Sequence, residues 1–571
     1  MNTISGGGFS ILIEKDKFFE KLILPQLYKV IGLVDKNPIS PTFGCFDRGY
    51  HHYKSKSFVN SMMQCYGMIL GKVYNLFFKS NSFYKDEQIK RLALASVRFT
   101  IVASRMDGSC DEHYLGEDSH VARVFSLISI LSILDEFPEI AIPESDLKKL
   151  QRMIAWPSKN PETAIIGNHI AATILMYLLA QKYFQIDYST IIKNWVKKLK
   201  SIQNPEGWFI EYDGCDLGYQ TLSNLFLLKS LVLFKDRHEP EDLDIENDLE
   251  QMYLKSIAFL CQFITPDGTL PAGFGSRNTS HLFIYGFLPF IGVDNRIKCI
   301  IETFEKNYIN GIIEKMEDDT FEFFPLIDLS LAISDSIDNS IIQSMLAKFI
   351  ESSHEIIDKR TQDAPNKWKI ITFNESGFYF ISNNKFSLWI ATRPVMAIEL
   401  FKENILEYRD MGASFHLKYT SNKIKCATMA EVYSIEFSMD KGEILMKGKI
   451  REIKKELLNP LKHIVLLLIG LFSSISFIKK IIKTLFIKKI VNRNHPIIGE
   501  FYRKVRINDN PKDRGPKADL KILNMHDEFL FKKKPEKIKI YKDFTKNLKY
   551  VPSNGFYTEK NFLSIRFTSD S

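Results

Sequence analysis

The chain has 571 residues, 45% of them hydrophobic and 13% aromatic, which predicts about two to four globular domains and excludes a disordered or fibrous protein. The net charge of +8 conceals an asymmetry: residues 441–571 carry 30 basic and 13 acidic residues, a net of +17, whereas residues 1–440 carry 46 and 55, a net of −9. Such a basic C-terminal part is typical of a solvated Lys-rich surface, or of a protein that meets anionic lipid, nucleic acid or an acidic polymer.

The seven cysteines are scattered singly and show no CxxC pair. We therefore expect a reducing compartment, no disulfide framework, and neither a bound metal nor a cofactor. Residues 1–10 are Gly/Ser-rich and lack the basic and apolar regions of a signal peptide, so we expect no export by the general route and a cytoplasmic location.

Helical periodicity dominates residues 15–355. The clearest predicted helices are Phe58–Phe78, Ile89–Ser104, Val121–Leu134, Ala164–Phe184, Ser189–Ile202, Thr221–Phe234, Leu249–Phe263, Arg296–Tyr308 and Ile341–Ile350. Three acid-Gly turns, at 106–109, 205–208 and 266–269, echo one another and indicate a repeated helical hairpin. Stacked hairpins of this kind form a solenoid or close into an α/α toroid, and their loops then gather at one end.

Short β-branched and aromatic runs take over in residues 366–571. The predicted strands are Trp368–Phe373, Gly377–Ile381, Phe386–Thr392, Ser414–Tyr419, Val432–Phe437 and Ile444–Ile450. The fold class we expect is therefore α+β and multidomain: an incomplete α/α toroid followed by an antiparallel β-sandwich that carries a helical, partly apolar insertion at about 460–491.

That insertion has two interpretations. Ile464–Ile478 is uncharged but shorter than the ~20 residues that span a bilayer as a helix. The following stretch places apolar residues on one face and lysines off it, which suits a helix lying on an anionic membrane surface through residues 461–491. A helical hairpin buried against the toroid or the sandwich explains the same pattern.

Chemically capable side chains cluster in the interhelical loops. The pair Asn168-His169 begins an apolar helix, and Tyr219 follows after one complete hairpin, an interval that returns a toroidal chain to the same rim. The segment 274–281 supplies Arg277, Asn278 and His281. Further candidates are Arg48, Tyr50, His52 and Trp208.

These residues carry a resemblance to a known family. The chain resembles the heparinase II/III-like polysaccharide lyases, whose members have an α/α toroid followed by a β-sandwich. The pieces that carry the resemblance are Phe46-Asp47-Arg48, Asp107-Gly108-Ser109 with Asp111-Glu112 and Gly116-Glu117, Asn168-His169 with Gly218-Tyr219-Gln220, and Gly275-Ser276-Arg277-Asn278-Thr279. They cover most of residues 40–290.

The resemblance implies β-elimination across C4 and C5 of a uronate. Asn168, supported by Arg277 or Asn278, would neutralise the carboxylate, because hydrogen bonds to a developing enolate-like charge are worth several kcal/mol. His169 or His281 would serve as the base, and Tyr219 would take the acid role or both roles. Arg48, Tyr50, His52 and Trp208 would contact the sugar chain.

One departure from the family leaves activity open. Active relatives commonly place a further His on a sandwich strand, and the nearest candidate, His416, lies in an alternating stretch that is typical of a structural strand. Either His281 takes that role, or the protein keeps the fold without turnover.

Two other classes of function remain. The acids Glu211, Asp213 and Asp216, or Asp111, Glu112 and Glu117, could form the pair that a glycoside hydrolase uses. A non-catalytic polysaccharide-binding or scaffold protein of a synthesis complex is the third class. By analogy we expect a role in capsule or O-antigen biosynthesis, in the cytoplasm or peripheral at the inner membrane, with an acidic polysaccharide and no nucleic acid as partner.

Overall fold

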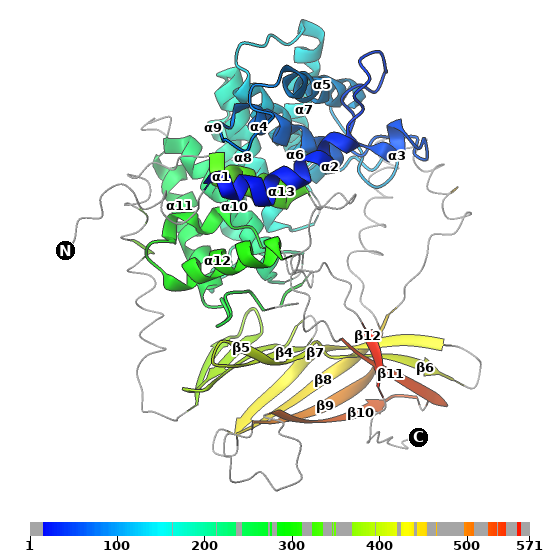
Figure 1. Ribbon diagram of the computed structural model, residues 1–571. Coiled ribbons are helices and arrows are strands. Elements are labelled where there is room, and N and C mark those ends of the chain that lie inside the picture. Colours follow the sequence, from blue (N-terminus) through cyan, green and yellow to red (C-terminus); the bar gives the residue numbers. More distant parts are fainter. Residues whose placement is uncertain are drawn as a thin grey trace, which may run out of the picture.

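The computed structural model describes a helical N-terminal part and a C-terminal part of antiparallel sheets, which confirms that much of the expected fold class (Figure 1). The described residues are 15–162, 164–212, 214–235, 243–271, 274–276, 282–310, 323–334, 345, 348–349, 368–393, 396–419, 424–438, 442–453, 464, 496–507, 523–533, 535–543 and 557–560.

Among the described residues, the helical part contains α-helices together with one π-helical and two 3-10 segments. Their bounds are α1 Lys15–Phe18, η1 Phe19–Ile23, α2 Leu24–Leu33, α3 Arg48–His51, η2 Met62–Tyr66, α4 Gly67–Asn75, α5 Glu87–Ala103, α6 His120–Glu136, α7 Glu144–Lys159, α8 Gly167–Phe184, α9 Ser189–Ser201, α10 Leu217–Lys235, α11 Leu243–Cys261, η4 Tyr285–Phe290, α12 Asn295–Ile309 and α13 Phe323–Ser334. The helix predicted at Phe58–Phe78 is instead η2 followed by α4, because the Asn60 side chain accepts the N–H groups of Met62 and Met63 and so begins the helical stretch there.

The helices lie in two layers with different burial. In α8, 14 of 18 residues are buried, whereas α9 buries only 4 of 13, all on one face. Helix α4 contacts α6, α6 contacts α8, α8 contacts α10 and α10 contacts η4, while α13 contacts both α4 and η4. The helices α5, α7, α9 and α11 cover this inner series from outside. A helix that is apolar on all sides, such as α8, must be enclosed by neighbouring elements, and the outer helices do this.

The strands form a five-stranded sheet in the order β1-β2-β3-β4-β5 and a seven-stranded sheet in the order β10-β9-β8-β7-β6-β11-β12. Their bounds are β1 Lys369–Phe373, β2 Phe378–Ser382, β3 Phe386–Ala391, β4 Ala397–Lys402, β5 Ile405–Asp410, β6 Ala413–Lys418, β7 Ile424–Ser438, β8 Glu443–Ile453, β9 Ile497–Ile507, β10 Leu523–Phe531, β11 Lys537–Asp543 and β12 Tyr557–Lys560. Every pairing is antiparallel.

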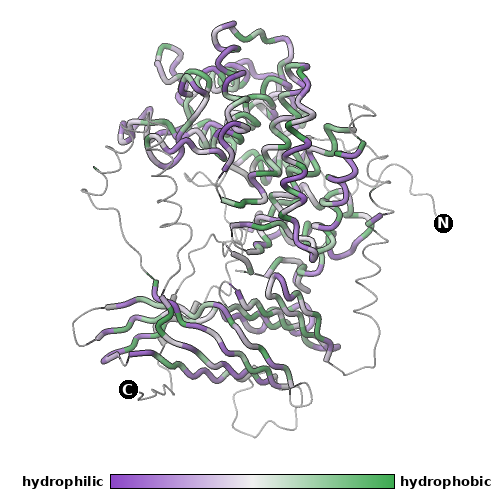
Figure 2. The backbone as a smooth tube through the Cα atoms, turned by 180° about the vertical axis from the view of Figure 1, so that it is seen from behind, coloured by the Kyte–Doolittle hydropathy of each residue, from purple (hydrophilic) through white to green (hydrophobic). Residues whose placement is uncertain are grey.

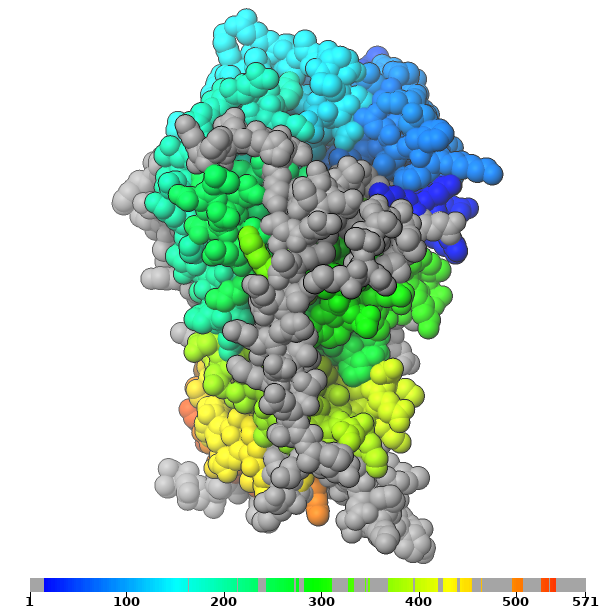
Figure 3. All heavy atoms as spheres, turned by 90° about the vertical axis from the view of Figure 1, so that its left-hand side faces the viewer, coloured from blue at the N-terminus to red at the C-terminus, as the bar shows by residue number. Residues whose placement is uncertain are grey.

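The middle strands β2, β3 and β4 of the five-stranded sheet are largely buried on both faces, whereas the edge strands β1 and β5 are partly exposed. Phe380 and Trp389, a cross-strand pair, face the helices, where the ring of Phe263 at the end of α11 lies 6.0 Å from that of Trp389. Leu388 and Ile390, on the opposite face of β3, share a second core with the seven-stranded sheet. The helices therefore lie against one sheet and that sheet against the other, as the space-filling view also shows (Figure 3).

The seven-stranded sheet is buried on one face only. Along β8 the side chains alternate strictly between the shared core and the outside. The strands in the tube coloured by hydropathy carry both hydrophobic and hydrophilic residues (Figure 2). This is the period of two that a half-solvated antiparallel sheet requires.

A buried ion cluster joins the two sheets. Arg503 of β9 is 1% exposed and donates to Asp410 of β5 at 2.9 Å and to Asp527 of β10 at 2.5 and 2.7 Å. Tyr408 donates to the same Asp410. The two carboxylates neutralise a charge that would otherwise be very costly in the core.

The insertion predicted at 460–491 lies outside the described residues, Ile464 excepted. Among the residues that are described, no helix is long and apolar enough to cross a membrane.

Replacement of Arg503 tests the ion cluster. Arg503→Met leaves two buried carboxylates without their cation, so we expect the free energy of unfolding to fall by about 3–5 kcal/mol. The matched control is Lys504→Met, because Lys504 is the next residue of β9 and its side chain is 46% exposed. Urea unfolding followed by circular dichroism measures both, and equal midpoints for the two variants would contradict the assignment.

Candidate functional site

The loops that precede the inner helices lie together at one end of the helical part. The loops leading into α8, α10 and η4 are joined by backbone bridges between Ile166 and Glu211 and between Asp216 and Gly275. The N–H of Gly167 donates to Ile210 O at 2.9 Å, and that of Tyr212 donates to Ile165 O at 2.9 Å. The structure therefore places Asn168, His169 and Tyr219 on neighbouring helix starts.

The three acid-Gly turns are anchors for the outer helices. Gly207 has φ +117°, and a Cβ there would lie 2.5 Å from the carbonyl oxygen of Lys255 on α11. Gly108 approaches Arg152 of α7 and Gly268 approaches Cys299 of α12 in the same way. The repeat seen in the sequence thus reflects a packing device, in which only glycine allows the turn to approach the next helix.

Glu211 is one of two fully buried acids among the described residues of this region, the other being Asp216. It is 0% exposed, its Oε1 accepts from Asn168 Nδ2 at 2.7 Å, and its backbone oxygen accepts from Ser276 Oγ at 2.7 Å. Burial raises the pKa of Glu211 to about 7, with Asp216 adding to the rise, while His169 and the Asn168 amide oppose it. Asn168 is 1% exposed, so its amide is committed to holding this carboxyl group.

His169 forms a dyad with Glu162. The Nδ1 atom of His169 lies 2.5 Å from Glu162 Oε2, and both side chains are partly exposed, at 14% and 23%. Burial lowers the pKa of His169, but Glu162 outweighs it, with help from Glu211 and Glu112, so that the pKa is raised overall. A carboxylate at Nδ1 fixes the tautomer that carries its lone pair on Nε2.

Tyr219 lies in the first turn of α10. Its N–H donates to Asp216 Oδ1 at 3.1 Å, so Asp216 caps this turn. Asp216 itself is 0% exposed, whereas Tyr219 is half-buried and packs against the helical core. Asp216 therefore has a structural role at the helix start, and the Tyr219 side chain is the more accessible of the two.

The loop 105–119 before α6 gathers acids beside this site. Asp111 and Asp118 pair with Arg105. Ser119, which caps α6 through the N–H of Ala122, also donates to Glu112 Oε2 at 2.9 Å. The pKa of Glu117 is raised by burial and by the charge of Glu112, although His113 opposes this.

The other predicted site residues have different surroundings. Trp208 is 5% exposed, and its Nε1 donates to Glu206, which also accepts the N–H groups of Glu375 and Ser376 at the β1–β2 turn. Trp208 thus lies in the contact between helices and sheet, with its ring out of reach of a sugar.

Arg48, Tyr50 and His52 belong to the short segment around α3. Arg48 lies over the Tyr53 ring at 5.1 Å, Tyr50 is half-buried and His52 is exposed. This segment reaches the loop 105–119 through the bond from Ser61 N to Asp111 O, 2.9 Å long. Arg277, Asn278 and His281, like Asp213, lie outside the described residues.

His416 lies on β6 of the seven-stranded sheet. Its neighbours Phe415 and Leu417 enter the core shared with the five-stranded sheet, so the exposed His416 lies on the opposite face. The five-stranded sheet separates that face from the helices, and His416 therefore does not supply the sandwich histidine of the family (Figure 1).

Comparisons with known proteins give weak similarities. No family model matches the chain, and no curated protein matches its sequence. A sugar epimerase from a ruminal bacterium is similar in structure with a TM-score of 0.40 and 13% identity, over 56% of this chain and 98% of that one. A Paenibacillus xanthan lyase gives a TM-score of 0.36 and 8% identity over 79% of this chain. The match covers 48% of the lyase, so this chain spans about half of that protein's length. TM-scores of this size assign neither a family nor an activity.

Sequence reasoning singled out neither Glu162 nor His113, and it considered Glu112 and Glu117 as hydrolase acids and not as metal ligands. Glu162 precedes His169 by seven residues with an irregular loop between them, so no helical or strand period relates the two. Only the fold of that loop brings the carboxylate to the ring.

The raised pKa of Glu211 predicts a pH dependence of stability. Because its folded pKa of about 7 lies above the ordinary value of 4.5, stability is fully present below about pH 4.5 and is lost as the pH rises through about 7. That difference corresponds to about 3 kcal/mol as an upper limit. Glu211→Gln keeps an acceptor for Asn168 and removes the titration.

We therefore expect the loss of stability between about pH 5 and about pH 8 to be smaller in Glu211→Gln than in the parent. Asp328, whose pKa burial also raises to about 7, contributes equally to both proteins and cancels in the comparison. Urea unfolding at the two pH values measures the difference, and identical pH dependences would contradict the assigned pKa.

Proposed function

We propose that this protein is a polysaccharide lyase-like enzyme that cleaves a uronate-containing polysaccharide by β-elimination, and that its helical part is an incomplete α/α toroid like that of the heparinase II/III-like lyases. The Glu162–His169 dyad carries the proposal. Abstraction of a proton from carbon needs a positioned base of suitable pKa, and a partly exposed imidazole oriented by a carboxylate is such a base.

In the proposed reaction His169 Nε2 takes the proton from C5 of the uronate. The electrons of that C–H bond form the C4=C5 double bond, and the C4–O4 bond breaks. Tyr219 donates its hydroxyl proton to the leaving O4, since it begins the helix next to α8 and is the more accessible side chain there. Glu162 accepts the Nδ1–H throughout and stabilises the imidazolium.

The substrate carboxylate must be neutralised before C5–H becomes acidic enough. Because Asn168 is buried and bonded to Glu211, we assign it a positioning role instead of the substrate contact expected from the resemblance. Arg277 and Asn278 follow Ser276 directly in the chain and are the proposed binders of the carboxylate, and His281 is the alternative base. Arg48, Tyr50 and His52 are proposed to contact more distant sugars.

One observation favours a glycoside hydrolase as the second candidate. The pKa of Glu211, about 7, is that of a general acid. However, Glu211 and Asp216 are both 0% exposed, so neither carboxyl group reaches a sugar in this arrangement. A place in cell-surface polysaccharide biosynthesis, in the cytoplasm or at the inner membrane, belongs to the proposal as its biological setting.

A screen of uronate polymers tests the proposed chemistry. We expect the parent protein to release an unsaturated uronate, seen by its ultraviolet absorbance, and His169→Ala and Tyr219→Phe to lower kcat by about 10²–10⁴-fold because each removes a proton-transfer group. New reducing ends without that absorbance would indicate a hydrolase. Full activity in both variants would show that the site is elsewhere.

Glu162→Gln tests the dyad itself. Without the charge of Glu162 the pKa of His169 falls, so the acidic limb of the kcat/KM profile should move to lower pH while the maximum rate drops. The control is Glu144→Gln at the exposed start of α7, where the side chain is 79% exposed. A Glu162→Gln profile that superimposes on the control would contradict the role given to Glu162.

A further inference from the structure

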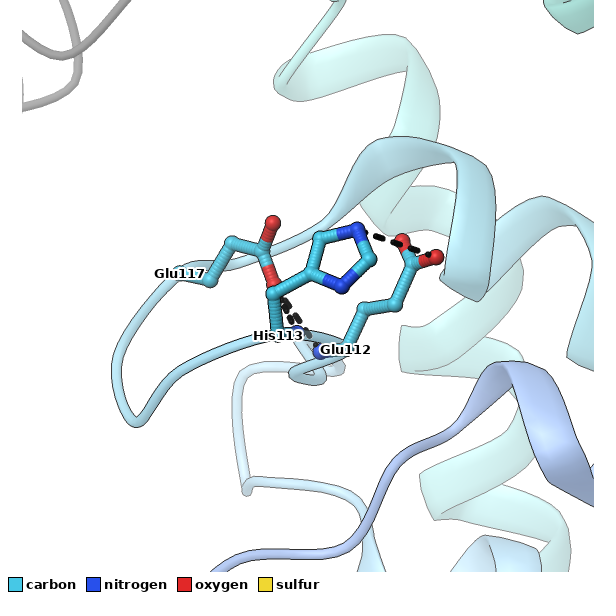
Figure 4. A group of neighbouring side chains, drawn as sticks. All are labelled: Glu112, His113 and Glu117. Carbon is cyan, nitrogen blue, oxygen red and sulfur yellow. Dashed lines mark hydrogen bonds and ion pairs between the residues drawn. The ribbon is translucent and has the colours of Figure 1, made fainter. Parts of the chain in front are cut away.

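Three potential metal ligands converge in the loop before α6. The ligand atoms of Glu112, His113 and Glu117 all lie within 4.8 Å of one another (Figure 4). The Glu112 side chain is 4% exposed, whereas His113 is 59% exposed and lies at the open side of the group. One buried carboxylate and one accessible imidazole thus face the same point.

The loop fixes each carboxylate through one of its oxygens. Glu117 Oε2 accepts the N–H groups of Glu112 at 3.0 Å and of His113 at 2.7 Å, which closes the loop. Ser119 Oγ donates to Glu112 Oε2 at 2.9 Å. In each case these bonds take Oε2, and Glu112 Oε1 faces the Nε2 atom of His113 at 3.4 Å. In metal sites, hydrogen bonds of this kind from neighbouring groups hold each carboxylate ligand in its orientation.

We propose that Glu112, His113 and Glu117 bind a divalent transition-metal ion of the Zn²⁺ type. The separation of Glu112 Oε1 and His113 Nε2, 3.4 Å, is too long for a strong hydrogen bond. Two atoms that each bind a tetrahedral ion at about 2.1 Å lie about 3.4 Å apart, so the spacing of Glu112 Oε1 and His113 Nε2 suits an ion. Glu117, within 4.8 Å of both, would supply the third ligand by a small side-chain movement. Two carboxylates and one imidazole leave a coordination position for an exogenous ligand.

A second His–Glu pair, His526 and Glu528, lacks a third ligand within the described part of the chain and can serve as a control. His526 Nε2 lies 3.6 Å from Glu528 Oε1, with side-chain exposures of 60% and 35%. It resembles the His113–Glu112 pair in spacing and in the exposure of the histidine, but no other group of three ligands occurs among the residues that the structure describes. The pair at His526 is therefore a matched control for adventitious binding.

If the protein is the proposed lyase, the position of the ion suits it to binding the substrate carboxylate. The charge of Glu112 contributes to the raised pKa of His169, so the metal would lie within electrostatic range of the proposed base. The acids Glu112, Glu117 and Glu162 give this end of the helices a negative field that repels a polyuronate. A divalent ion with an open position would offset that field and bind a substrate carboxylate.

Titration of the metal-free full-length protein with Zn²⁺ alone, against a chromophoric chelator, tests the site. We expect one tight equivalent in the parent and in His526→Ala, and an affinity at least about 10-fold lower in His113→Ala and in Glu117→Gln. A Zn²⁺-dependent rise of Tm should follow the same order, since a ligand that binds the native state stabilises it.

Equal affinity in all four proteins, or no tight equivalent in the parent, would overturn the proposed site. Neither result bears on the β-elimination chemistry, which the screen of uronate polymers reads separately. Conversely, a protein that binds Zn²⁺ through His113 and Glu117 but produces no unsaturated uronate retains the metal site and loses the proposed lyase activity.

Discussion

The candidate site depends on one buried carboxyl group, Glu211. Its side chain holds the Asn168 amide at the start of α8, its backbone bridges to Ile166, and its carbonyl oxygen accepts from Ser276 in the next loop. Three loops therefore converge on one residue that is 0% exposed. An unpaired buried carboxyl group is costly, so the amide and the loops are held in one arrangement with it. The same burial raises the pKa of Glu211.

The sheets secure the same end of the helices. Glu206, in the loop that contains Glu211, accepts the N–H groups of Glu375 and Ser376 from the five-stranded sheet. Phe263 packs between the helices and that sheet, with its ring 5.3 Å from Phe378. The middle strands of this sheet are largely buried on both faces, so the sheet packs both against the helices and against the seven-stranded sheet. The helix starts that carry His169 and Tyr219 are in this way fixed from within by Glu211 and from below by the sheet.

Much of this architecture could be predicted from the sequence. The helices around Asn168 and Tyr219 and the alternating strand at Phe415 follow from periodicity, which local burial dictates. Strand β4 was missed because Ala397–Phe401 is buried on both faces and shows no alternation. The burial of Trp208 could not be predicted, because an aromatic residue in a loop packs in a core as readily as it contacts a sugar. The Glu162–His169 dyad could not be predicted, because an irregular loop brings the two together and no sequence period describes it.

His169 is proposed to act as a base on carbon, in a region where acids outnumber cations among the described residues. The most direct test of this role is the fate of water during cleavage of a polyuronate. If the reaction is run in water labelled with a heavy oxygen isotope, β-elimination gives products that carry no label and have the mass of the chain cut without addition of water. Mass spectrometry of the oligosaccharide ends should show this outcome. Labelled oxygen at the new reducing end would contradict the account and identify a hydrolase.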